Sequence, residues 1–193
     1  MAKINKEQLL EEVKSYGYEI NTIDDLKKIG SKDKRLIPLL FDKIRDSDDV
    51  SDKEFLIRCL GVKGFNEVIP TIMQEYRRTE NQFLKWAIGN TVYLIEDRNV
   101  IPDVIEIVKD KKNGMSRQMF ILYLGKTRDE KALPVLKELL HDNEVAAHTI
   151  RALSEYKMPE LVSILEPFTK HKSTLIRKES QRAIKKLQSL TSK

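Results

Sequence analysis

The sequence has few of the residues that disulfides, tight turns and membrane spans require. Cys59 is the single cysteine among 193 residues, which excludes an internal disulfide and any metal site built from several cysteines. Seven glycines and six prolines are few for the many tight turns of a β-sandwich. No apolar run approaches the roughly 18 residues that a membrane-spanning helix needs. These shortages predict a helical chain that makes no contact with a membrane.

The opening residues also lack the features of a secretion signal. The stretch "MAKINKEQLLEEVK" has no apolar core followed by a cleavage site of small residues. Together with the single cysteine, this favours a cytoplasmic location. Hydrophobic residues make up 40% of the chain and charged residues 34%, which is typical of a helix-rich protein, and no run alternates with the two-residue period of a strand.

Motifs that carry chemistry are missing as well. The histidines 141, 148 and 171 lack the spacing of an H-E-x-x-H metal site, and no glycine-rich phosphate loop or G-x-S-x-G elbow can be written from the glycines present. The acidic stretch "RDSDDVSD" at 45–52 lacks the turn glycine of a calcium loop, and Ile57 stands where the last ligand should be. We therefore predict no catalytic residue, no metal, no cofactor and no enzymatic activity.

What the chain has instead is an internal repeat. The stretches "RLIPLLFDKI", "EVIPTIMQEY", "NVIPDVIEIV" and "KALPVLKELL" place Pro38, Pro70, Pro102 and Pro134 at a constant spacing of 32 residues. A fifth stretch, "ELVSILEPFT", follows after 29 residues and carries Ser163 where the others have proline. A period of this size indicates an array of stacked units.

Each unit contains two helical patterns, which we call helix A and helix B. Helix A carries the proline near its start, where the first backbone N–H groups have no partner within the helix, so a proline costs little. In the first two units, "SDKE" at 51–54 and "TENQ" at 79–82 predict a capping box at the start of helix B. The predicted bounds are an N-terminal cap at 1–32 and an array at 33–193 with units near 33–64, 65–96, 97–128, 129–157 and 158–190, in one structural domain.

Aligning the B helices on the proline gives apolar columns that predict the core, Leu60/Val92/Leu124/Leu153 and Leu56/Ile88/Phe120/Thr149. A mostly small column, Gly61/Tyr93/Gly125/Ser154, predicts tight packing between neighbours. Two polar columns also repeat, Asp46/Arg78/Asp110/Asp142 at the end of helix A and Lys53/Lys85/Arg117/Ala146/Arg177 in helix B. We expect these two columns to pair between units, with interruptions at Arg78, Ala146 and Ser163.

A proline in helix A, an aspartate at its end and a basic residue early in helix B form a pattern that resembles HEAT repeats, over about residues 33–190. The strings "LLHDNEVAAHTIRALSEYKMPELVSIL" and "STLIRKESQRAIKKL" are similar to the bacterial HEAT-like class known from phycobilin lyases. The resemblance implies an all-α fold, an α-solenoid that forms a right-handed superhelix of about five two-helix repeats with N-terminal capping helices.

A stripe of polar and aromatic positions lies on one face of the B helices, because its members are four residues apart. In arrays that look like this one, the B helices usually line the concave side. The stripe includes Trp and Arg, the residue types most often found as binding hot spots. We call this set the B-helix stripe, and its candidate binding residues are Glu54, Arg58, Trp86, Asn90, Gln118 and Arg151.

Positive charge is concentrated at the C-terminal end. The whole chain carries +5, and residues 168–193 alone hold eight basic residues against Glu179. Such a cluster can bind phosphates, or it can form the solvated face of a terminal unit. We call this candidate set the basic patch, and it consists of Arg177, Lys178, Arg182, Lys185 and Lys186.

Three functions remain open from the sequence. The first is a non-enzymatic scaffold that binds a protein or peptide along the B-helix stripe. The second is nucleic-acid binding through the basic C-terminal unit, as in the HEAT-like alkylpurine DNA glycosylases, although no catalytic Asp can be matched. The third, from the resemblance alone, is a bilin-lyase-like role in handling a pigment. The sequence leaves the oligomeric state undefined.

Overall fold

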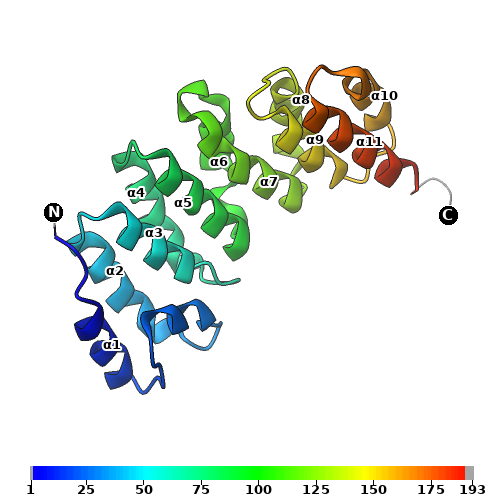
Figure 1. Ribbon diagram of the computed structural model, residues 1–193. Coiled ribbons are helices and arrows are strands. Elements are labelled where there is room, and N and C mark those ends of the chain that lie inside the picture. Colours follow the sequence, from blue (N-terminus) through cyan, green and yellow to red (C-terminus); the bar gives the residue numbers. More distant parts are fainter. Residues whose placement is uncertain (1, 190–193) are drawn as a thin grey trace. The chain divides into compact units, whose positions relative to one another are not determined.

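The computed structural model describes residues 2–189, which form helices joined by loops. The chain divides into two compact units, one ending at Asp97 and the other beginning at Arg98. Within each unit, antiparallel helix pairs stack in chain order (Figure 1). This arrangement confirms the expected all-α, solenoid-type fold, while the right-handed superhelix and the five repeat bounds stay predictions. No helix among residues 2–189 combines the length and the apolar character needed to cross a membrane.

The first unit holds the N-terminal cap and two helix pairs. Its α-helices are α1 Lys6–Ser15, α2 Ile37–Asp46, α3 Val50–Cys59, α4 Ile69–Arg78 and α5 Gln82–Ile95. Its 3₁₀ helices are Ile23–Lys28, Lys34–Leu36 and Asn66–Val68. Helices α2 and α4 are the A helices, α3 and α5 are the B helices, and α3 packs directly against α5. Helix α1 and the first 3₁₀ helix lie within the N-terminal cap expected at 1–32.

The second unit holds three helix pairs. Its α-helices are α6 Ile101–Lys109, α7 Arg117–Thr127, α8 Leu133–Leu139, α9 Ala146–Ser154, α10 Leu161–Leu165 and α11 Thr174–Gln188. Its 3₁₀ helices are Arg98–Val100, Lys111–Ser116, Glu130–Ala132 and Glu166–Lys170. The B helices α7, α9 and α11 pack in succession, α7 on α9 and α9 on α11. The shortest A helix is α10, in the unit where Ser163 replaces the repeated proline.

Each repeated proline lies in the first turn of its A helix, at the junction with a 3₁₀ turn. In the second repeat the chain enters a 3₁₀ turn at Asn66, and α4 begins at Ile69, so Pro70 is its second residue. Pro38, Pro102 and Pro134 have the same position in α2, α6 and α8. The proline removes an N–H that has no helical partner there, which is the explanation expected from the sequence.

The start of helix B differs from the capping boxes predicted at "SDKE" and "TENQ". Helix α3 is capped by Asp49, whose carboxylate accepts hydrogen bonds from the backbone N–H groups of Ser51 and Asp52. Helix α5 is capped in the same way by Asn81. Both predictions were wrong because a carboxylate or amide two residues away competes effectively with a hydroxyl for these N–H groups.

The predicted core columns are confirmed. All eight members, Leu60, Val92, Leu124, Leu153, Leu56, Ile88, Phe120 and Thr149, are fully buried. The small column is explained best at Gly125 in α7, where an added Cβ would lie 2.5 Å from the Cα of Ala152 in α9. Because that neighbour is backbone, it cannot move aside easily, and a glycine is required for this close approach of two B helices.

A backbone feature that the sequence analysis missed lies six residues before each proline position. Gly64, Glu96, Arg128 and Lys157 all have a positive φ, between 53° and 84°, at the turn that leads from helix B to the next repeat. The left-handed conformation suits glycine, but three of these four residues carry a side chain and therefore incur strain. From the sequence, a positive φ could be predicted only at Gly64, because Glu96, Arg128 and Lys157 are not residue types that favour this conformation.

Replacing Arg128 by glycine should stabilise the protein. Arg128 ends α7 with φ 53° and is exposed, so the substitution removes strain without removing buried surface. We expect Arg128→Gly to raise the free energy of unfolding by roughly 0.5–1 kcal/mol. Urea denaturation followed by circular dichroism measures the change. Lys126→Gly, within the last turn of the same helix, is the matched control and should lower stability by about 1 kcal/mol; a loss in both variants would contradict the explanation.

Candidate functional site

In the first unit, three residues of the B-helix stripe form one cluster. The guanidinium of Arg58 on α3 donates two hydrogen bonds to one carboxylate oxygen of Glu54, at 3.0 and 2.7 Å. The same guanidinium lies over the indole ring of Trp86 on α5, 5.3 Å from its centroid. Trp86 is half-buried, and the side chain of Arg58 is 37% exposed. Asn90, one turn further along α5, is also half-buried. The cluster therefore presents an ordered aromatic and a charge to solvent.

Also in the first unit, an ion pair joins helix B of one repeat, α3, to helix A of the next, α4. Lys53 of α3 donates to the carboxylate of Glu75 in α4 at 2.9 Å, and Glu75 is buried. Arg78 stands where the repeat has aspartate, and we expected an interruption there. Glu75, one turn earlier on α4, supplies the carboxylate instead, and Arg78 itself lies 3.6 Å from it. The expected interruption at Arg78 is therefore wrong, because a residue one turn away reaches the same place.

In the second unit the repeated basic position holds a fully buried arginine. Arg117, at the start of α7, donates to the backbone carbonyl of Gly114 at 2.9 Å and to a carboxylate oxygen of Asp142 at 2.9 Å. A second guanidinium nitrogen donates to Glu144 at 3.0 Å. Asp142 and Glu144 lie in the loop between α8 and α9. Arg117 thus pairs with the aspartate of the following repeat, whereas the expectation from the sequence pairs a basic residue with the aspartate of the preceding one. Lys85, at the same position of the second repeat, instead lies 3.6 Å from Glu80 of its own repeat.

The Asp142 carboxylate should contribute stability that depends on pH. Burial raises its pKa, but hydrogen bonds from Arg117 and from the backbone N–H of Glu144 outweigh burial, so the pKa falls below the ordinary value of 3.8. Asp142→Asn should lower the free energy of unfolding at pH 7 by about 2 kcal/mol, because the buried guanidinium loses a charged acceptor. Urea denaturation measures the loss.

The pH dependence of that loss is the diagnostic part of the experiment. A carboxyl with a lowered pKa stabilises the fold above pH 4 or so and ceases to do so as the pH falls through its pKa. The difference between wild type and Asp142→Asn should therefore shrink below this pH. Glu138→Gln, at an exposed position of α8, is the control and should be neutral throughout. A penalty that is the same at pH 7 and pH 3 would contradict an ionic origin.

The rest of the B-helix stripe lies in the second unit. Gln118 on α7 is half-buried and offers little surface, and Ala147 on α9, which is not a member of the stripe, is buried. Arg151, one turn beyond Ala147, is exposed and lines a small pocket between α9 and α11 with a volume of about 180 Å³. Burial and the nearby charge of Arg151 lower the pKa of His148, one turn earlier on α9.

Several residues of the basic patch form hydrogen bonds or ion pairs within the protein. Arg177 donates to the backbone carbonyls of His171 and Lys172, both at 2.8 Å, and so closes the loop before α11. The other four residues, Lys178, Arg182, Lys185 and Lys186, are exposed. Arg182 pairs with Glu179 at 2.7 Å, and Lys186 pairs at 2.6 Å with Glu155, the C-cap residue of α9. These carboxylates reduce the charge that the patch could offer to a phosphate backbone.

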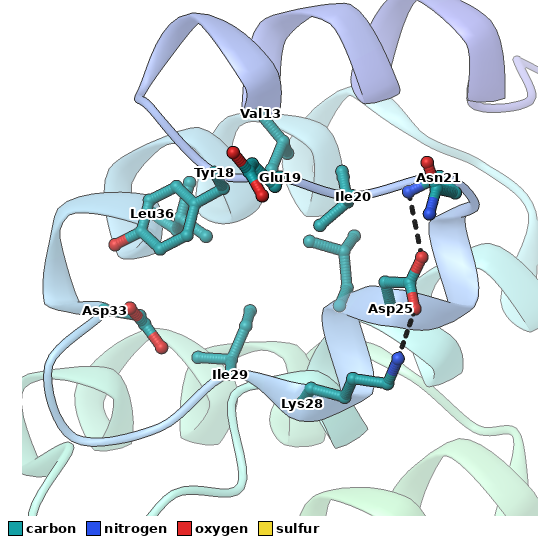
Figure 2. A pocket seen from close by; sticks show the side chains of 11 residues that line it. Val13, Tyr18, Glu19, Ile20, Asn21, Asp25, Lys28, Ile29, Asp33 and Leu36 are labelled. Atoms are coloured by element: carbon teal, nitrogen blue, oxygen red, sulfur yellow. Dashed lines mark hydrogen bonds and ion pairs between the residues drawn. The ribbon is translucent and has the colours of Figure 1, made fainter.

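A second cavity lies in the N-terminal cap, with a volume of about 220 Å³ (Figure 2). Its walls mix apolar side chains such as Ile20 and Ile29 with polar ones such as Asp25. The Asp25 carboxylate accepts from Lys28 at 2.6 Å and from the backbone of Asn21 at 2.9 Å, and these contacts lower its pKa. Asp25 is also the N3 residue of the capping box at the start of the 3₁₀ helix Ile23–Lys28, so its carboxylate oxygens already have structural hydrogen bonds.

The remaining polar features of the sequence have structural roles. In the acidic stretch 45–52, Asp48 and Asp52 accept the backbone N–H groups of Ala2 and Ile4, at 3.2 and 2.8 Å, and hold the start of the chain. Burial raises the pKa of Cys59 to about 12, as suits a small core residue rather than a reactive thiol.

Comparison with known proteins agrees with the architecture of stacked helix pairs. A family model described as HEAT repeats matches residues 69–146. This segment runs from α4 to the start of α9 and includes the repeats around Pro70, Pro102 and Pro134. None of the curated proteins matches the chain.

Proposed function

Because this chain is a HEAT-repeat protein, we propose that it is a non-enzymatic scaffold that binds a protein or peptide on the exposed faces of its B helices. HEAT repeats in general mediate protein interactions, which supports this class of function. The phycobilin-lyase-type subclass stays a prediction from the resemblance. A cytoplasmic location is part of the same proposal.

The observation that carries the proposal is the Glu54–Arg58–Trp86 cluster. Trp and Arg are enriched at binding hot spots, and here they contact each other on adjacent B helices. Glu54 fixes the guanidinium with two hydrogen bonds, so Arg58 loses little conformational freedom when a partner arrives. The indole is half-buried, which orients it while leaving part of the ring accessible. An ordered aromatic–cation pair is suited to packing against an apolar side chain and a neighbouring polar group.

The test uses peptides selected from a random library on the wild-type protein. Binding of a selected peptide is then measured by fluorescence anisotropy on purified variants. We expect Trp86→Ala to weaken binding at least about tenfold, because truncation of a central aromatic anchor removes a hot spot. Arg58→Ala should weaken it by a smaller factor.

Gln74→Ala, at an exposed position of the A helix α4, is the control and should bind like wild type. Circular dichroism of each variant separates lost binding from lost structure. If every selected peptide binds Trp86→Ala and wild type equally well, the cluster is not the binding surface and the proposal fails.

A further inference from the structure

The pocket between α9 and α11 has a regular arrangement of charge. Arg151 lies on α9 and Glu155, about one turn later, is the C-cap residue of that helix, and on α11 the residues Glu179, Arg182 and Lys186 follow at similar spacing. The two carboxylates are each paired, Glu179 with Arg182 and Glu155 with Lys186. Among the residues that line the pocket, the cation without an ion pair in the described structure is Arg151.

Arg151 is therefore the source of an uncompensated positive charge at the pocket. Its side chain is exposed, and its guanidinium has no hydrogen-bond or ion-pair partner among residues 2–189. Burial is the main cause of the lowered pKa of His148; the charge of Arg151 lowers it further, and the carboxylate of Glu179 opposes the shift. The lowered pKa disfavours the charged form of His148.

The net charge of the pocket favours a singly charged anion over a multiply charged one. Three basic and two acidic side chains give it one excess positive charge. A doubly charged phosphate would be repelled by Glu155 and Glu179, and the closely spaced phosphates of a nucleic acid would meet the same repulsion. A carboxylate carries a single charge, and its two oxygens match the two parallel N–H donors of a guanidinium.

We propose that this pocket binds a carboxylate of a partner peptide, with Arg151 as the principal donor and Arg182 and Lys186 beside it. The proposal rests on the peptide-binding function above and adds the chemical class of the ligand, an acidic peptide. The carboxylate can come from an Asp or Glu side chain or from the C-terminus of the partner. The B helices α9 and α11 would then contact the acidic part of the partner.

The test is an NMR titration of the full, ¹⁵N-labelled chain with small carboxylates. Acetyl-glutamate amide represents a side-chain carboxylate, and acetyl-glycine represents a C-terminal one. Either compound should shift the amide signals of α9 and α11 near Arg151. The compound that binds more tightly shows whether the partner's carboxylate comes from a side chain or from a C-terminus. Acetyl-glutamine amide, the neutral isostere, should give no such shifts.

Variants at exposed positions link the shifts to the pocket. Arg151→Gln should weaken carboxylate binding about tenfold, since it removes a charged bidentate donor. Arg151→Lys retains the charge without the bidentate geometry and should weaken it less. Lys178→Gln, an equal loss of charge on α11 outside the pocket, should bind like wild type.

The proposal is overturned if the shifts persist in Arg151→Gln, if acetyl-glutamine amide produces them equally, or if inorganic phosphate or a short DNA duplex binds more tightly than the carboxylates. Its outcome is separate from that of the scaffold proposal, because Trp86 belongs to the other compact unit. If the selected peptides require Trp86 but not Arg151 for binding, the scaffold proposal is supported and the carboxylate site is contradicted.

Discussion

The buried guanidinium of Arg117 is the interaction on which the second unit depends most. A fully buried charge is tolerated only when its donors are satisfied, and Arg117 satisfies them with the carbonyl of Gly114 and the carboxylates of Asp142 and Glu144. Gly114 lies in the 3₁₀ helix before α7, and the two carboxylates lie in the loop before α9. The arginine therefore fixes the start of two successive B helices, and the positions of the side chains that follow on α7 and α9 depend on it.

Most of the fold could be predicted from the sequence because it is repeated. Prolines at a spacing of 32 residues give the register, and the apolar columns on either side of Leu60 and Leu124 give the buried face of each B helix. These signals are local and periodic. The caps were predicted less well, since Asp49 and Ser51 offer competing acceptors within one turn and only the backbone geometry decides between them.

The candidate sites could be predicted only in part, for a related physical reason. The stripe placed Arg58 and Trp86 on suitable faces, but their contact spans two helices and has no signature in a single sequence. Likewise, the pairing of Lys186 with Glu155 joins residues far apart in the chain, so composition alone overstated the charge of the basic patch. The pocket that brings Arg151 and Arg182 together arises where two separately predicted sets meet.

The contact between Lys53 and Glu75 has a consequence for how the repeats of this array correspond to one another. Lys53 pairs with a carboxylate of α4, although Arg78 replaces the aspartate of this repeat. Arg117 pairs with carboxylates in the loop after α8. In these two repeats the basic residue pairs with a carboxylate of the following repeat, and the position of that carboxylate differs by about one turn. These two repeats therefore correspond more closely in the helices and loops that their ion pairs join than in the aligned positions of their acidic residues.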